Sequence, residues 1–183
     1  MAGCATFPAK DNSVLNSYKS AVMLNYSDSK TKFKKKAIIA AKLPDKIRFE
    51  VRGFWNEPLL IIFGVSDKLT AYFPVSGYFY ENSGSINTSD LLKILSGCSE
   101  GFCPITVNNK KSTAYISYDK AKETLLPKKT EITVDDIKLV VTFLDPAINE
   151  EIKDDMFEIK IPEKAKRIEK QEDFFKMINS LGK

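Results

Sequence analysis

Hydrophobic and polar residues alternate along much of the first half of the chain. Alternation is clear over residues 37–43, 47–51, 69–73 and 78–80, whereas residues 58–65 are apolar at nearly every position. Such alternation is typical of a half-buried β-strand. Only short turns separate most of these segments, and parallel strands would need connections of a dozen or more residues. The pattern therefore predicts a meander of neighbouring antiparallel strands.

Three other segments carry hydrophobic residues at helical spacing. Residues 12–22 begin with a polar residue suited to the N-cap and predict a helix near the N-terminus. Residues 87–97 begin with Asn-Thr-Ser-Asp and end at a glycine, which predicts a second, short helix. Residues 174–181 predict a final amphipathic helix. The rest of the second half predicts strands at residues 104–108, 113–118, 130–134, 137–143 (ended by Asp145-Pro146) and 157–161.

Two of the predicted strands, at residues 37–43 and 58–65, are apolar on both sides. An antiparallel sheet with one solvated face should alternate cleanly, so something apolar must cover both faces of these strands. Helices or an apolar ligand would serve. A strongly curved sheet encloses a concave side that the predicted helices are sufficient to lid. A fully packed core of sheet and helices is the alternative.

Composition narrows the possible chemistry. The chain has 183 residues, a net charge of +4 and no histidine, so the usual general base and the commonest neutral metal ligand are missing. The acid pairs Asp135-Asp136 and Asp154-Asp155 lack the spacing of a calcium loop, and we interpret them as surface turns. No glycine-rich phosphate loop and no nucleic-acid motif is present. We expect no catalytic residue, metal or cofactor, and no nucleic-acid partner.

A short loop carries two large aromatic residues, Phe54 and Trp55, between Gly53 and Asn56-Glu57. Leaving such a side chain in water costs roughly 1.5–3 kcal/mol, unless it serves contact. Tryptophan is also common at membrane interfaces. One reading is an exposed contact loop, and the other is a loop that folds back and buries Trp55. A lysine run, at Lys30, Lys32 and 34–36, would either meet phospholipid headgroups or be a solvated strand end.

The cysteines give two further predictions. Met1-Ala2-Gly3-Cys4 reads like the end of a bacterial lipoprotein signal, which predicts that Cys4 is lipidated and that residues 1–11 are a signal remnant and tether. A free terminal cysteine is the alternative. Cys98 and Cys103 have glycines around them and suit a small disulfide loop in an oxidising compartment, or two unpaired thiols. Residues 12–183 are expected to form a single β-domain with a C-terminal helix.

The chain resembles the LolA/LolB family of lipoprotein carriers, in particular the lipid-anchored acceptor LolB. The resemblance rests on the spacing and type of residues rather than on a diagnostic motif. The matching segments are PDKIRFEV at 44–51 followed by a loop and PLL at 58–60, DKLTAYFP at 67–74, YFY at 78–80, the helix at 89–95, and FEIKIP at 157–162 leading to Arg167-Ile168. The cysteine at position 4 agrees with the lipid-anchored branch.

The resemblance implies a mainly β fold with a few helices: an incomplete antiparallel β-barrel lidded by helices around an apolar cavity that receives acyl chains. It also implies a monomer anchored in the outer membrane and facing the periplasm. A protruding loop would meet the membrane, which falls here on Phe54 and Trp55, an aromatic pair where the family has an aliphatic residue. The two cysteines at 98 and 103 are not a family feature. Candidate cavity residues are Ile39, Ile47, Phe49, Val51, Phe73, Leu139, Val141 and Phe143.

The function predicted from the sequence is therefore a lipid-anchored envelope protein that binds acyl chains and passes lipoprotein or lipid cargo to the outer membrane. Its expected partners are the acyl chains of lipoproteins or other lipids, the membrane surface and a periplasmic carrier protein. Two alternatives stay open. One is a binding module for another apolar ligand, such as a phospholipid, and the other is a structural lipoprotein with a packed core that binds a partner through its loop.

Overall fold

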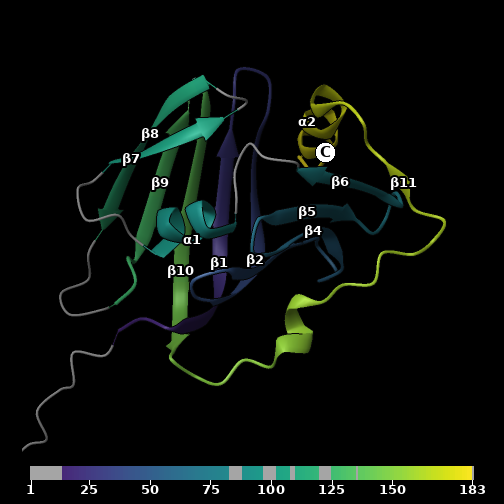
Figure 1. Ribbon diagram of the computed structural model, residues 1–183. Helices are drawn as coiled ribbons and strands as arrows, with labels where there is room; N and C mark the ends of the chain where they lie inside the picture. The colour runs from purple at the N-terminus through teal and green to yellow at the C-terminus, as the bar shows by residue number, and fades with distance from the viewer. Residues whose placement is uncertain are drawn as a thin grey trace, which may run out of the picture.

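The described residues form one open sheet of eleven strands (Figure 1). The computed structural model describes residues 14–82, 88–96, 102–107, 110–119, 125–134 and 136–182, and for 102–107, 110–119 and 134 it describes the backbone alone. The strands are β1 Ser17–Ser27, β2 Lys32–Lys42, β3 Lys46–Arg52, β4 Pro58–Val65, β5 Lys68–Phe73, β6 Tyr78–Asn82, β7 Phe102–Val107, β8 Lys110–Asp119, β9 Lys129–Val134, β10 Ile137–Ile148 and β11 Lys166–Arg167. They are ordered β11-β6-β5-β4-β3-β2-β1-β10-β9-β8-β7.

All neighbouring strands are antiparallel except β11, which pairs parallel with β6. The predicted meander is confirmed as β3 to β6, and β2 extends it on one side. The sheet does not close on itself, so its two outer strands β11 and β7 are not paired with each other. The prediction of a mainly β, incomplete barrel with helices on its concave side is thus confirmed.

The helix predicted over residues 12–22 is wrong, because residues 17–27 form strand β1. Tyr18 and Val22 are four residues apart, a spacing that places side chains on one face of a helix and also on one face of a strand. Leu24 and Tyr26 decide between the two, since they continue the period of two and are buried with Val22. β1 pairs with β2 on one side and β10 on the other, which places it in the middle of the sheet.

Two predictions in the second half also need correction. β10 does not end at Asp145-Pro146 but continues to Ile148. Asp145 adopts a positive φ of 48°, and the pairing of β10 with β1 shifts register there, opposite Lys19–Ala21, so that the strand can continue. Such bulges let a strand continue past an unfavourable residue. The strand predicted at 157–161 is absent from the described sheet; the short helix η1, Asp154–Phe157, precedes an extended segment there.

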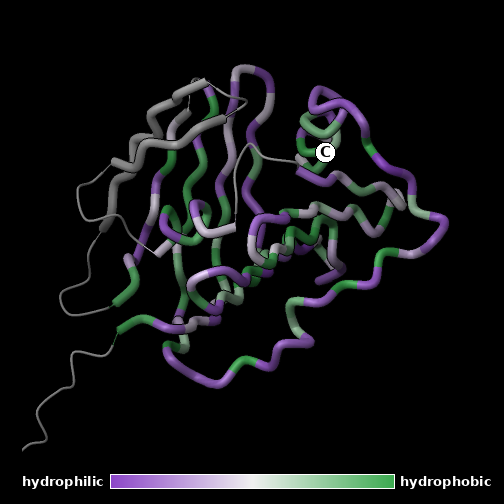
Figure 2. Tube along the Cα trace, viewed as in Figure 1, coloured by the Kyte–Doolittle hydropathy of each residue, from purple (hydrophilic) through white to green (hydrophobic). Residues whose placement is uncertain are grey.

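That segment belongs to a strap, residues 149–170, which runs along the outside of the sheet (Figure 1). Hydrophobic and hydrophilic residues are interspersed along it (Figure 2), and they alternate strictly over residues 157–161. Phe157 and Ile152 are buried against Ala40 of β2 and form a small cluster on the outer face. An extended chain lying on a sheet has one packed and one solvated side, so residues 157–161 show the period of a strand without pairing as one, whereas β11 further along the strap does pair with β6.

The strap explains why β2 and β4 are apolar on both sides: it covers the outer face, and the helices cover the inner one. Helix α1, Thr88–Ser96, packs against β3 on the concave side, and Leu92 and Leu95 are buried there. Gly64 of β4 permits this approach, because a Cβ at that position would collide with the Thr88 side chain. Helix α2, Gln171–Ser180, follows the strap and lies near β6 (Figure 1). Both helices were predicted from the sequence.

Candidate functional site

The candidate site is the concave face of the sheet. The structure places all eight predicted cavity residues in or against one hydrophobic cluster on this face. Seven of them are buried, and Leu139 is half-buried. They come from β2 (Ile39), β3 (Ile47, Phe49, Val51), β5 (Phe73) and β10 (Leu139, Val141, Phe143). Alternation along each strand turns these residues to the same side, and the curvature of the sheet then brings them together. Their role as ligand contacts stays a prediction.

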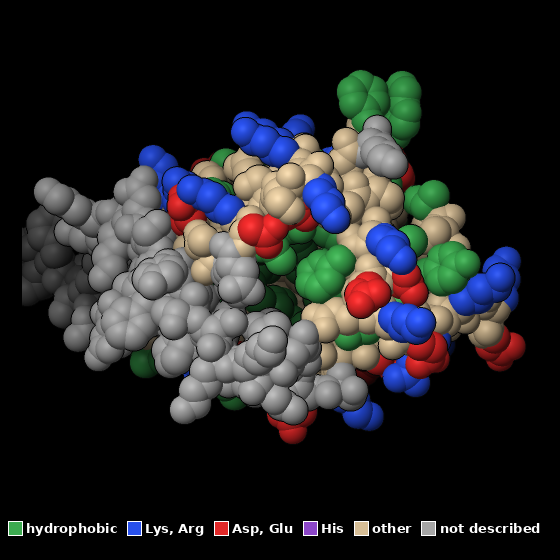
Figure 3. Space-filling view, turned by 90° about the horizontal axis from the view of Figure 1, so that it is seen from above, with side chains coloured by type: hydrophobic (Ala, Val, Ile, Leu, Met, Phe, Trp, Pro, Cys, Tyr) green, Lys and Arg blue, Asp and Glu red, His purple; other side chains and the backbone are tan. Residues whose placement is uncertain are grey.

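Helix α1 occupies part of the concave side. Leu92 and Leu95 of this helix belong to the same cluster as the strand residues. Thr88 donates a hydrogen bond from its hydroxyl to the carbonyl oxygen of Lys68 at 3.3 Å, which attaches the start of the helix to the start of β5. Between the described elements a hollow is visible, with hydrophobic side chains at its floor and charged side chains on its rim (Figure 3). The helix therefore fills one side of the concavity and leaves a depression beside it.

Helix α2 covers the same cluster less tightly. Its apolar side chains Phe174, Met177 and Ile178 pack against the cluster, but in this helix, all of which the structure describes, no residue is fully buried. The ring of Phe174 stacks on Tyr80 with centroids 4.7 Å apart and meets Phe73 edge-on at 6.0 Å. An amphipathic helix held by partly buried contacts is a lid, since its removal exposes the cluster without breaking the sheet.

Two buried hydroxyl groups lie among the apolar side chains. Thr130 of β9 is fully buried, and its hydroxyl has no hydrogen-bond partner among the described residues. Tyr18 of β1 is also fully buried, and burial raises its pKa far above the ordinary value, an effect that the neighbouring Ser96 offsets in part. The Tyr18 hydroxyl therefore stays neutral at physiological pH. The sequence did not single out either residue as part of the site. Tyr18 fell within the predicted helix at 12–22, and a hydroxyl side chain at an alternating strand position, such as Thr130, carries no distinctive signal.

The second part of the site is the loop between β3 and β4. Its ends are joined by hydrogen bonds: Gly53 N–H donates to the Glu57 carbonyl at 2.8 Å, and Asn56 N–H donates to the Gly53 carbonyl at 3.2 Å. Asn56 adopts the left-handed conformation with φ 65°, which asparagine tolerates well. The Arg52 guanidinium donates to the Asn56 carbonyl at 2.7 Å. The loop is thus fixed by its own backbone and by a neighbouring arginine.

This loop presents its two aromatic residues to solvent. Phe54 is 88% exposed and Trp55 is 85% exposed, and their rings meet edge-to-face with centroids 5.0 Å apart. The alternative in which the loop folds back and buries Trp55 is therefore wrong. Two large apolar side chains held in water by a well-defined turn are typical of a contact surface, and that role stays a prediction.

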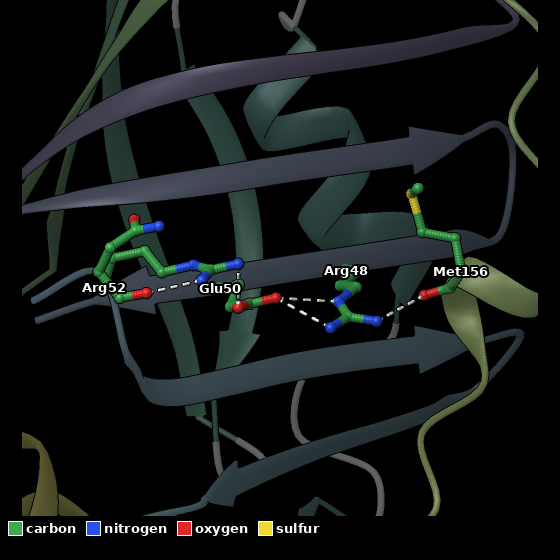
Figure 4. Close-up of polar contacts among 5 residues, drawn as sticks. Arg48, Glu50, Arg52 and Met156 are labelled. Carbon is green, nitrogen blue, oxygen red and sulfur yellow. Dashed lines mark hydrogen bonds and ion pairs between the residues drawn. The ribbon is translucent and has the colours of Figure 1, made fainter.

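A charged cluster on the outer face holds the strap to β3 (Figure 4). The carboxylate of Glu50, only 8% exposed, accepts hydrogen bonds from Arg48 at 2.9 and 3.2 Å and is paired with Arg52 at 2.5 Å. Arg48 also donates to the carbonyl oxygen of Met156 in the strap at 3.1 Å. Alternation predicted a solvated position for Glu50. The prediction missed its burial because the strap that covers it comes from residues about a hundred positions away.

The remaining predicted residues lie at the surface or outside the described part of the chain. Asp154 is exposed and is paired with Lys42 at 2.9 Å and Lys46 at 3.0 Å; these lysines lower the pKa of its carboxyl group. Within the described residues no group of three or more His, Cys, Asp or Glu could hold a metal. In the same part of the chain, no helix is long and apolar enough to cross a membrane. Cys4, Cys98 and Asp135 lie outside the described residues, and Cys103 is described only as backbone in β7.

A second depression, of about 690 Å³, lies on the outer face between β4 and the strap. Phe63 and Val65 line it from the strand, and Phe157 and Ile159 line it from the strap. Because it is largely apolar, any test of ligand binding to the concave side must separate the two places.

No family model matches the sequence, and no curated protein matches it either. Among solved structures, the chain is similar to a LolA superfamily protein from Nitrosomonas europaea, with a TM-score of 0.50 and 8% identity over 84% of this chain and 92% of that one. It is also similar to a putative outer membrane lipoprotein-sorting protein domain from Vibrio parahaemolyticus, with a TM-score of 0.48 and 7% identity over 78% and 89% of the two chains. The first similarity shows that the chain has a LolA-like fold, which confirms that part of the resemblance seen in the sequence.

Proposed function

We propose that the protein is a non-enzymatic carrier of the bacterial cell envelope, which binds acyl chains on the concave side of its half-barrel and passes lipoprotein or lipid cargo to the outer membrane. The observation that carries the proposal is the continuous hydrophobic cluster on the inside of an open sheet, one side of which helix α2 covers with partly buried contacts. Lipidation of Cys4 would anchor the domain and keep it near the membrane.

Binding of an acyl chain needs apolar surface and no bond chemistry. Burying hydrocarbon stabilises a complex by about 0.8 kcal/mol per CH₂ group, so a chain of several carbons in the hollow is enough for useful affinity. Where the cargo has a polar link, such as an ester, the hydroxyl of Thr130, which has no partner among the described residues, would offer a hydrogen bond at the cluster. The absence of histidine from the chain fits a protein that moves its cargo without reacting with it.

The exposed loop would deliver the cargo. Phe54 and Trp55 have few contacts to lose when they enter the interface of a bilayer, and their burial there is favourable. In this proposal the hollow binds the hydrocarbon, and the loop brings the protein to the membrane that receives it.

Displacement of a fluorescent fatty acid tests the proposal. Leu139→Trp adds bulk to a half-buried wall position and should weaken binding of the probe at least tenfold, while Phe63→Trp in the outer depression should leave it unchanged. Urea unfolding of both variants checks that they remain folded. Equal effects of the two substitutions, or none, would contradict a site on the concave side. Mass spectrometry of lipids that co-purify with the protein would then distinguish lipoprotein acyl chains from phospholipids.

A structural protein with a packed core is the second candidate. It is favoured by the complete burial of Leu92 and Leu95, which shows that α1 already fills part of the concavity. This candidate predicts that the wild-type protein does not bind the fatty-acid probe at all and that its loop binds a protein partner.

A further inference from the structure

A row of lysines lies beside the aromatic loop. Lys32, Lys34 and Lys36 are exposed on β2, and their neighbours Phe33 and Ala37 are buried on the opposite face. Because strand residues rise by about 3.3 Å each, the three lysines follow one another at intervals of roughly 7 Å on one face of the sheet. We name these three residues the lysine row.

Strand register connects the lysine row to the loop. Lys36 pairs with Arg52, the last residue of β3 before the loop begins. β2 and β3 are antiparallel, so the loop projects past the end of β3 in the direction of Lys34, which lies about 7 Å further along β2. The loop residues Phe54 and Trp55 therefore stand beside the row and not at the far end of the molecule.

Among the described residues, no acidic side chain lies opposite the lysine row on the two strands that flank it. On β1, the residues paired with Lys36, Lys34 and Lys32 are Met23, Asn25 and Ser27, all uncharged. None of the three lysines forms an ion pair with a residue that the structure describes. On the other side, the charge of Arg52 is already engaged by Glu50. A positive field from three neighbouring ammonium groups thus remains directed to solvent.

We infer that the aromatic loop and the lysine row form one surface that selects bilayers containing anionic phospholipids. Phe54 and Trp55 enter the interfacial region while the ammonium groups pair with headgroup phosphates of anionic lipids. Both contributions are needed on one face, because rings alone would bind any bilayer and lysines alone would bind any polyanion. The inference rests on the proposed function, to which it adds the kind of membrane that accepts the cargo.

Trp55 provides the measurement, because it is the single tryptophan of the chain. Its emission should shift to the blue when the protein is titrated with vesicles of phosphatidylcholine and phosphatidylglycerol. Vesicles of phosphatidylcholine alone, and a short single-stranded oligonucleotide, should produce little shift at the same concentrations. Added salt should weaken the binding, because the charges are exposed and screened within about 10 Å at 0.1 M.

A matched pair of variants isolates the row. Lys32→Gln, Lys34→Gln and Lys36→Gln together should weaken binding to the anionic vesicles about a hundredfold, or about fivefold for each lysine. The control carries Lys153→Gln, Lys160→Gln and Lys164→Gln, three exposed lysines of the strap, and loses the same net charge. It should change the affinity less than fivefold.

Several results would overturn the inference. Equal losses in the two triple variants would mean that net charge alone acts, and equal binding to neutral vesicles would mean that the row has no role. Tight binding to the oligonucleotide with a similar shift would favour a nucleic acid as the ligand of this surface. No binding to either kind of vesicle would rule out its proposed role in membrane binding. The fatty-acid probe tests the proposed function separately. The variant of the lysine row should bind the probe like the wild type. Failure of the wild type to bind the probe would reject the carrier function but would leave the result with vesicles unchanged.

Discussion

Truncation of Phe174 to alanine should detach the lid without unfolding the sheet. Its ring makes two aromatic contacts outside its own helix, with Tyr80 and Phe73, each worth about 0.5–1.5 kcal/mol beyond the area it buries. The side chain is half-buried, so the loss of apolar burial adds about 1 kcal/mol. The substitution should therefore favour the undocked helix by about 2–4 kcal/mol.

Native-state hydrogen exchange is the assay, because it reports local opening separately from global unfolding. A change of 2 kcal/mol corresponds to about a thirtyfold rise in exchange rate. We expect a rise of this size for amides of α2, and less than threefold for the central strands β1 and β2. Phe175→Ala is the control, since Phe175 contacts Phe174 at 5.6 Å but does not pack against the cluster. If the central strands exchange faster by the same factor as α2, or if the control behaves like Phe174→Ala, then α2 is not a separate lid.

Three further outcomes are expected. Glu50→Gln should lower the free energy of unfolding in urea by about 3 kcal/mol, because it leaves Arg48 and Arg52 without their shared, buried carboxylate; a loss below 0.5 kcal/mol would show that solvent replaces the pair. Asp154→Asn should destabilise the protein slightly at pH 7 and not in acid: Lys42 and Lys46 lower the carboxyl pKa in the folded state, so the stability that this group contributes is present above its unfolded pKa and is lost as the pH falls through the folded value. Trp55→Glu should leave probe binding and urea stability unchanged, since the side chain is 85% exposed, but should abolish cargo delivery to acceptor vesicles; a loss of both activities would argue against a separate role for the loop.

Local periodicity was sufficient to predict most of the sheet and the inward-facing residues. Ile47, Phe49 and Val51 alternate strictly with charged residues, so their common face followed from the chain alone. The helix α2 and the loop before β4 were predicted for the same reason, because an amphipathic repeat and a short aromatic turn are local features. Their placement, as a lid and as an exposed pair, needed the structure.

The errors occurred where the chain contacts residues distant in sequence. The spacing of Tyr18 and Val22 fits two periods, and only pairing of β1 with strands on both sides determines which one holds. Residues 157–161 alternate because they lie on a sheet face, a context that no local pattern distinguishes from pairing within a sheet. The same contact buries Glu50, whose charged neighbours in the sequence predicted a solvated position.

The parallel pairing of β11 with β6 limits how far the lid can travel. Ile168 is held by a hydrogen bond from its N–H to the Phe79 carbonyl at 2.7 Å, and α2 begins three residues later. The three steps from Ile168 to Gln171 extend to at most about 11 Å. A released α2 therefore stays close to its anchor at Ile168. Its return is a unimolecular step that would compete with a bound hydrocarbon for the same apolar side chains of the cluster.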